Sequence, residues 1–174
     1  MLHYFLSFLT LFALLGCNTA TKEPTPKQNQ KQMHTMPAKM FQSVNSDQAT
    51  LVQTGKNKLY CARCGMNLVM FYKTSHTATY EDKEYQYCSI HCLTDHLSEG
   101  IELRNPKVVD VVSLKLIPVQ NAFYVVGSDV KGTMSRVSKY AFASLKDAQA
   151  FQAKHGGKIV DFYAALEVAK KDFR

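Results

Sequence analysis

Tryptophan is absent from this chain of 174 residues, although ten phenylalanines and nine tyrosines remain to fill an interior. Dense blocks of lysine and arginine interleaved with aromatic residues are also missing. The net charge is +7, but the lysines are scattered singly along the chain. This distribution argues against nucleic-acid binding and suits a solubility or docking function of a basic surface. With 46% hydrophobic residues, the composition predicts an ordinary packed core rather than a disordered chain.

The apolar N-terminal stretch, residues 2–15, is too short to span a membrane. At about 1.5 Å per helical residue it falls short of a hydrocarbon core of about 30 Å, and its length suits the apolar region of a signal peptide. It ends in Leu-Leu-Gly-Cys at residues 14–17, which resembles the lipobox of bacterial lipoproteins. The resemblance implies that residues 1–16 are removed and that Cys17 carries lipid. The mature protein is then expected to face the periplasm, anchored to the cell membrane or the outer membrane.

Apolar periodicity is missing from the next stretch, residues 17–50, which is rich in Thr, Lys, Gln and Pro. Such a segment buries too little surface to offset its ordering entropy, so it is predicted to be a flexible linker. It also contains Met33, His34, Met36 and Met40, whose thioether and imidazole groups suit copper. Flexible methionine is common filler, however, and the plain linker is the favoured interpretation.

Cysteine is scarce, and the four cysteines after Cys17 form two close pairs. Cys61 and Cys64 flank two residues, and Cys88 and Cys92 are four apart, which places them one turn apart on one face of a helix. Between the pairs, strand-like runs lie at residues 68–73, 78–80 and 85–88. Ser89 is a plausible N-cap for a helix over residues 90–98. The sequence therefore predicts a cysteine knuckle, a β-hairpin and a helix that starts beside Cys88.

This cysteine pattern is compatible with a metal site of four thiolates and also with two disulfides. Paired cysteines separated by a hairpin are typical of metal sites, whereas an exported protein meets an oxidising compartment in which disulfides form. Met66 favours the metal site, since Gly65 can adopt a positive φ that directs Cys64 and Met66 toward one point. A thioether beside thiolates favours Cu(I) over Zn(II).

The histidines are weaker ligand candidates. His76, near the predicted hairpin, and His96, one turn beyond Cys92, are each possible additional ligands. His91 lies between two cysteines in sequence but on another helix face, so it is expected to face solvent.

The second half repeats the succession of two strands and a helix. Strands are predicted at 108–112, 121–127, 140–143 and 158–160, and helices at 145–155 and 162–170, with a capping box at residues 144–147. The predicted fold is therefore α+β, with two small ββα-type modules of antiparallel strands. Their expected bounds are residues 51–104, with the cysteines, and residues 105–174.

Three segments resemble the NosL family of copper-binding lipoproteins that assist assembly of nitrous oxide reductase. They are residues 61–66 (Cys-Ala-Arg-Cys-Gly-Met), residues 123–134 (Phe-Tyr-Val-Val-Gly-Ser-Asp-Val-Lys-Gly-Thr-Met), and residues 148–151 with Gly156 and Gly157. The resemblance covers about residues 60–162. It implies Cu(I) near Cys64 and Met66, with a methionine such as Met134 as a possible further ligand. It also implies delivery to a membrane-bound maturation complex that contains an ABC transporter and nitrous oxide reductase.

Cys88 and Cys92 depart from the commonest pattern of that family. Residues 87–92 (Tyr-Cys-Ser-Ile-His-Cys) instead resemble a TRASH- or YHS-type metal-binding knuckle, so the ion can also sit on four thiolates with Met66 as a spectator. The expected function is a membrane-anchored copper(I) chaperone and not an enzyme. A structural zinc module for protein interaction is the first alternative. A thiol–disulfide redox protein is the second, although a hairpin rather than a long helix follows Cys61 and Cys64.

Overall fold

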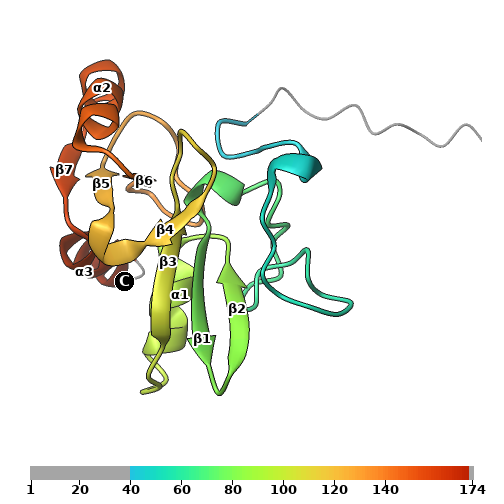
Figure 1. The fold of residues 1–174 in the computed structure, drawn as a ribbon. Helices are drawn as coiled ribbons and strands as arrows, with labels where there is room; N and C mark the ends of the chain where they lie inside the picture. The colour runs from blue at the N-terminus through green and yellow to red at the C-terminus, as the bar shows by residue number, and fades with distance from the viewer. Residues whose placement is uncertain (1–39, 173–174) are drawn as a thin grey trace, which may run out of the picture. The chain divides into compact units, whose positions relative to one another are not determined.

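The computed structural model describes residues 40–172, which fold into two antiparallel sheets and three α-helices (Figure 1). The predicted α+β class with two ββα units is confirmed by this architecture. The signal peptide, Cys17, and the linker residues Met33, His34 and Met36 lie outside the described residues. The elements in chain order are β1 (His76–Tyr80), β2 (Lys83–Tyr87), α1 (Ile90–Leu97), β3 (Arg104–Val109), β4 (Leu116–Pro118), β5 (Phe123–Val126), β6 (Lys139–Phe142), α2 (Leu145–His155), β7 (Lys158–Val160) and α3 (Phe162–Asp172).

The first ββα unit consists of the hairpin β1–β2 and helix α1. Its two-residue turn has positive φ at both Glu81 (46°) and Asp82 (60°), the geometry that matches the twist of paired strands. Ser89 is the N-cap of α1 by position, but its side chain makes no capping hydrogen bond. The predicted hairpin and helix are thus present and lead directly into the second cysteine pair.

The strand expected at residues 68–73 is not formed, and turns followed by a short 3-10 helix (Tyr72–Thr74) take its place. The side-chain oxygen of Asn67 accepts hydrogen bonds from the backbone N–H groups of Val69 (2.9 Å) and Met70 (3.1 Å). An asparagine that binds its own chain in this way stabilises a turn in competition with a strand ladder. The apolar residues are still buried, since Leu68 and Tyr72 are both 0% exposed.

The first sheet has four strands in the order β2–β1–β3–β4. β3 ends at Val109 rather than continuing to residue 112, because the Asp110 carboxylate accepts hydrogen bonds from the backbone and the hydroxyl of Ser113. β4 was not predicted, as it is only three residues long and ends in proline. β3 begins at the expected boundary, residue 104, and extends into the second expected module, yet it pairs with β1 of the first.

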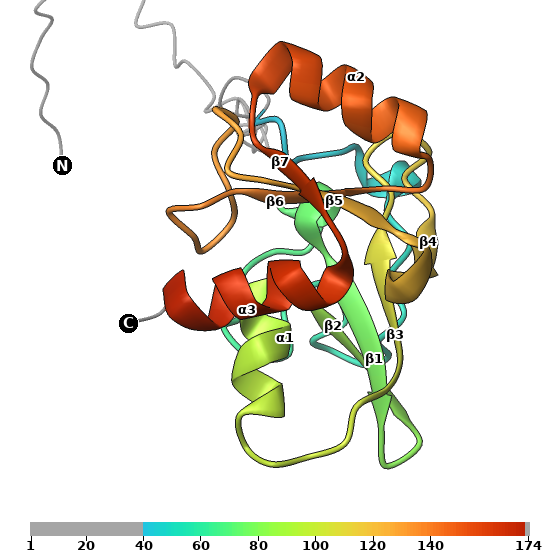
Figure 2. The ribbon, with the colours of Figure 1, turned by 90° about the vertical axis from the view of Figure 1, so that its left-hand side faces the viewer.

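The second sheet has three strands in the order β6–β5–β7. In Figure 2, α2 lies on one face of this sheet and α3 lies on the other. The Ser144 hydroxyl accepts a hydrogen bond from the Asp147 backbone N–H (3.1 Å), so the predicted cap of α2 is present. The sheets meet where Val111 N–H donates to the Ala141 carbonyl (3.0 Å).

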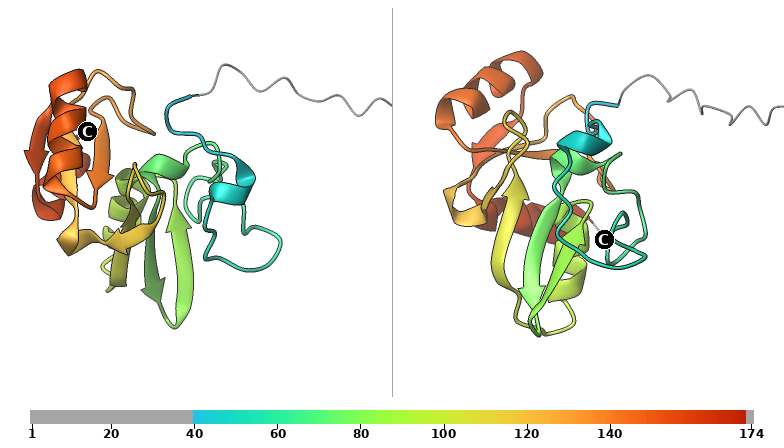
Figure 3. Two further views of the ribbon diagram at one scale, coloured as in Figure 1. Left: turned by 45° about the horizontal axis from the view of Figure 1, so that its top comes forward. Right: turned by 45° about the vertical axis from the view of Figure 1, so that its right-hand side comes forward.

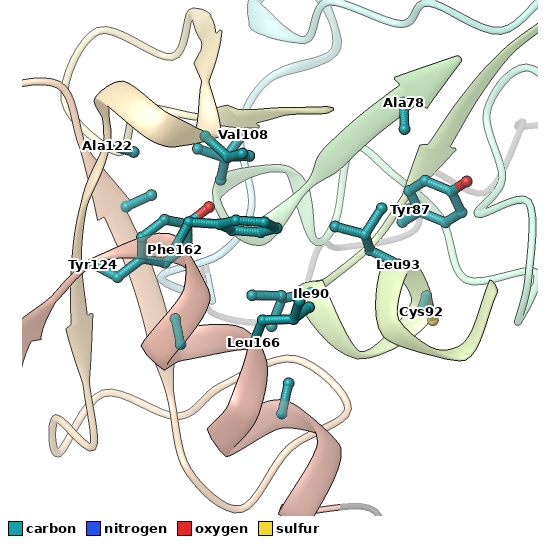
Figure 4. Close-up of a cluster of buried hydrophobic side chains, with 14 of the residues drawn as sticks. Ala78, Tyr87, Ile90, Cys92, Leu93, Val108, Ala122, Tyr124, Phe162 and Leu166 are labelled. Atoms are coloured by element: carbon teal, nitrogen blue, oxygen red, sulfur yellow. The ribbon is translucent and has the colours of Figure 1, made fainter. Parts of the chain in front are cut away.

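The main core lies between α1, α3 and both sheets. Figure 4 shows Ile90 and Leu93 of α1 facing Phe162 and Leu166 of α3, with Cys92 on the same helix. Because α1 carries one cysteine pair near its start, this packing fixes the helix end on which those cysteines lie.

Packing begins earlier than the expected domain start at residue 51, as the blue and cyan segment in Figure 3 shows. The Phe41 ring meets Tyr140 edge-on with centroids 5.1 Å apart, and Val44 is 5% exposed. Among residues 40–172, none of the helices combines the length and apolar character needed to cross a bilayer.

Candidate metal centre

The first cysteine pair lies in a tight knuckle. The backbone N–H of Cys61 donates to the Met66 carbonyl (2.8 Å), and the N–H of Gly65 donates to the Cys61 carbonyl (3.1 Å). Gly65 has φ +72°, the positive φ expected for this position, and a bridge between Tyr60 and Asn67 closes the base of the loop. These bonds hold the two thiols on one side of a compact turn.

The second pair follows β2 directly. Cys88 precedes the N-cap of α1, Cys92 lies in the first turn of that helix, and their sulfurs are 3.8 Å apart. The Cys88 carbonyl accepts a hydrogen bond from the Thr74 hydroxyl (2.7 Å). The knuckle is held beside this pair because the Ala62 N–H donates to the Gln86 carbonyl of β2 (2.9 Å).

The four thiols converge, with all four Sγ atoms of Cys61, Cys64, Cys88 and Cys92 within 4.8 Å of one another. The Cys64 and Cys88 sulfurs are 3.5 Å apart, and all four cysteines are free. A tetrahedral ion with metal–sulfur bonds of about 2.3 Å places its sulfurs about 3.8 Å apart, whereas a disulfide needs about 2.05 Å. The observed spacing therefore fits four ligands around a soft cation.

Exposure divides the cluster into three buried thiols and one accessible thiol. Cys61, Cys88 and Cys92 are at most 5% exposed, whereas Cys64 is exposed. An ion held here is shielded on most sides and is reachable at Cys64.

Among the three buried thiols, Cys61 is the one favoured as the thiolate in the absence of a cation. The thiols of Cys88 and Cys92 lower the pKa of Cys61 well below its usual range. The pKa values of Cys88 and Cys92 are raised, in each case first by the contact with Cys61 and also by burial. A second thiolate is disfavoured by like charge in a buried site. A bound cation removes that penalty, so metal binding releases protons.

An ion-pair network holds the knuckle against α1. The Arg63 guanidinium donates to Asp95 (2.8 Å) and contacts Glu99, and both carboxylates follow Cys92 along the chain. Arginine in such a fork gives orientation as well as charge. Sequence reasoning missed Arg63, although its place between two cysteines and the acidic residues after the helix cysteine were visible in the sequence.

The structure places His76 and His96 outside the group of four thiols. The His76 ring nitrogens contact the Thr74 carbonyl (3.0 Å) and the Tyr124 hydroxyl (3.1 Å), and burial lowers its pKa to about 4. His96 Nδ1 contacts the Tyr87 hydroxyl (2.8 Å), and burial lowers its pKa. His76 thus links β1 to β5 of the second sheet, and His96 links α1 to β2.

The methionines differ in exposure. Met66 is partly buried and packs against the main core cluster, to which Cys61, Cys88 and Cys92 belong. Met134 is 47% exposed and has a positive φ of 55° in the loop between β5 and β6.

His91 was expected to face solvent, and that prediction is wrong: it is 1% exposed. Its Nε2 contacts the Lys139 ammonium (3.1 Å) and lies 3.4 Å from the Asp172 carboxylate at the end of α3. Burial, with the nearby Lys139 charge, lowers the pKa of His91 to about 4. The face of α1 that appeared free in the sequence is covered by α3 and β6, elements that arrive much later in the chain.

Comparison with known proteins agrees with this fold. The family model of NosL matches residues 52–167. Among solved structures, the crystal structure of the copper chaperone NosL from Shewanella denitrificans superimposes with a TM-score of 0.51. That match has 22% sequence identity and covers 66% of this chain and 96% of the other. Among curated proteins, none matches this sequence.

Proposed function

The chain belongs to the NosL family, and from this premise we propose that it is a copper(I) chaperone that carries one ion on its thiol cluster. The observation that carries the proposal is the convergence of Cys61, Cys64, Cys88 and Cys92 with one thiol exposed. Soft thiolate ligands select Cu(I) and Zn(II) over hard cations. The solved relative of similar fold is named as a copper chaperone, which supports copper as the cargo.

The unequal exposure of the thiols supports a carrier rather than an enzyme. Copper passes between proteins when the thiols or imidazoles of an acceptor replace the donor's ligands one at a time. Cys64 is the accessible ligand and therefore the first to be replaced, while the three buried thiols retain the ion until a second acceptor ligand arrives. Met66, next to the knuckle glycine, supplies a thioether that packs against the core cluster containing Cys61, Cys88 and Cys92.

The proposal includes a location and a destination. Residues 14–17 (Leu-Leu-Gly-Cys) support a lipid anchor on Cys17 that keeps the protein at the periplasmic side of a membrane. Membership of the NosL family supports delivery of copper to a membrane-bound complex that matures nitrous oxide reductase.

The test is metal binding by reduced, anaerobic protein. We expect about one equivalent of Cu(I) per chain, with X-ray absorption showing a shell dominated by sulfur. A matched titration of a variant in which all four clustered cysteines are serine controls for binding elsewhere, including the methionines near the N-terminus. Failure of the wild-type protein to bind Cu(I) more tightly than that variant would overturn the proposal.

A structural zinc site is the second candidate, because the sulfur spacings of 3.5 and 3.8 Å also suit tetrahedral Zn(II). The two functions differ in how readily the bound metal ion is exchanged. A carrier gives up its ion to a competing chelator without unfolding, whereas a structural zinc ion is lost together with the fold. Zinc that is bound tightly and not displaced by Cu(I) would favour the structural site.

A further inference from the structure

The outer edge of β2 exposes unpaired backbone groups beside the metal centre. β2 is the edge strand of its sheet, and its turn to β1 pairs Tyr80 with Lys83. In antiparallel strands, alternate residues direct their N–H and C=O groups toward the partner strand and away from it. The Gln86 carbonyl points away from β1, since it accepts from Ala62, and the groups of Glu84, two residues earlier, point the same way. Outside the ladder with β1, no backbone hydrogen bond to Glu84 is present within residues 40–172.

A groove of about 740 Å³ runs along this edge, a volume typical of ligand-binding clefts. One wall of the groove is formed by β2, including Glu84. The other wall is formed by the loop over residues 52–60, including Gln53 and Tyr60. Figures 1 and 3 show this loop in teal beside β2. The groove ends on Cys61 and Gly65, which are residues of the metal knuckle.

The register connects the groove to the thiols. The bond from Ala62 to Gln86 already fills the position of a neighbouring strand at one end of the edge. A bound segment that pairs with Glu84 does so two strand residues from the Ala62–Gln86 hydrogen bond, a distance of about 7 Å. A side chain one or two residues along such a segment therefore reaches the knuckle at Gly65, which is adjacent in the chain to the exposed Cys64.

We propose that the groove along β2 binds an extended segment of the copper acceptor by strand addition, with backbone hydrogen bonds to Glu84 that guide a soft side chain to the thiol cluster. The role of this docking in copper delivery rests on the proposed function as a copper carrier, whereas the strand pairing at β2 does not depend on it. An added strand obtains affinity from its main chain and specificity from alternate side chains. The loop over residues 52–60 forms the outer wall, so one strand fits, whereas the edge of a second copy would bring its own loop into the same space.

The probe is an acetylated, amidated peptide of alternating valine and threonine around one central methionine, added to isotope-labelled full-length protein. We expect shifts in the amide signals of residues 52–62 and 82–86, and slower hydrogen exchange of the Glu84 amide. A peptide of the same composition with proline inserted beside the methionine is the control and should not bind. This measurement needs no variant, so it remains decisive if a substitution perturbs the fold.

Two variants isolate the backbone hydrogen bond. Glu84→Pro and Glu84→Ala both remove the carboxylate, but only proline removes the outward N–H, and the bonds to β1 are unaffected. We expect the proline variant to bind the peptide about fivefold or more weakly than the alanine variant, because one backbone hydrogen bond is lost. The proposal would be overturned by equal peptide affinities of the two variants or by amide shifts at another surface. It would also be overturned by no binding at millimolar peptide or by self-association of the protein through this edge.

Metal-free and Cu(I)-loaded protein are compared in the same experiment. Peptide pairing at Glu84 in a protein that binds no Cu(I) would refute the carrier and leave the strand site intact. Cu(I) binding without pairing would refute the strand site and leave the carrier intact.

Discussion

Gly65→Ala tests whether the knuckle conformation contributes directly to metal affinity. Gly65 has φ +72°, and a Cβ added there meets no atom within 4 Å. The substitution therefore adds backbone strain without a clash, at a cost of about 1–2 kcal/mol for a residue with a Cβ in the left-handed region. In the metal-free protein the knuckle can relax to relieve that strain. Bound metal enforces the original geometry, so the strain energy opposes binding.

The expected loss of Cu(I) affinity is about 5- to 30-fold, since 1.4 kcal/mol corresponds to a factor of ten. Competition against a chromophoric Cu(I) chelator under anaerobic conditions measures it. Gly156→Ala is the matched control, because Gly156 has φ +69° and equally open surroundings at the end of α2, a helix that carries no cysteine. Both variants should lower the melting temperature of the metal-free protein, but only Gly65→Ala should lower affinity. Unchanged affinity in Gly65→Ala, or an equal loss in Gly156→Ala, would refute the reasoning.

Four further outcomes are expected. Cys64→Ser should weaken Cu(I) binding strongly, whereas Met66→Leu should weaken it only slightly with an unchanged circular dichroism spectrum, since a thiolate contributes charge and a thioether does not. The Cys88→Ser/Cys92→Ser double variant should lose Cu(I) affinity and also the rise in melting temperature on metal loading; unchanged values for both would show that these thiols are not ligands. Cu(I) affinity should fall as pH is lowered from 8 to 6, by about tenfold per pH unit for each proton displaced, because the raised pKa values of Cys88 and Cys92 leave both protonated in the metal-free protein. Competition titrations corrected for chelator protonation measure this slope, and an affinity that does not change with pH would contradict the prediction. Cys17→Ser should release the protein from membranes or leave an unprocessed precursor, and mature protein that still partitions into detergent would argue against lipidation.

Local signals predicted most of the elements around the site. The Ser144 cap, the turn before β2 and the Gly65 knuckle each depend on residues only a few positions apart, so a short window of sequence contains the whole cause. The strand prediction at residues 68–73, which was wrong, and the one at residues 108–112, which extended past the end of β3 at Val109, have a shared origin. Asn67 and Asp110 each stand beside an apolar run, and the side-chain oxygen of each binds nearby backbone N–H groups. Hydrophobic content predicted burial correctly there, but a polar residue determined the backbone conformation.

Long-range contacts explain what sequence reasoning missed. The Asp172 carboxylate lies 3.2 Å from the Lys139 ammonium, and together they cover His91 on α1, 81 residues before Asp172 in the chain. A helix face can be classified as polar from its own residues, but whether another element covers it depends on the tertiary fold. Sequence spacing likewise allowed both disulfides and a metal site, and the bond from Ala62 to Gln86 that brings the two cysteine pairs together is not apparent in either motif.

For the proposed copper carrier, the arrangement of the cluster offers a way for retention and release to coexist at one site. Cys88 and Cys92 are held by α1, whose packing against α3 belongs to the main core, and Cys61 is held by backbone bonds at the base of the knuckle. Cys64 is at the outer corner of the knuckle, next to Gly65 and exposed. An acceptor can therefore displace one ligand without disturbing the core, and the cost of opening the site is confined to one turn. If all four thiols were buried, exchange would require local unfolding of α1, and transfer would then be as slow as that opening.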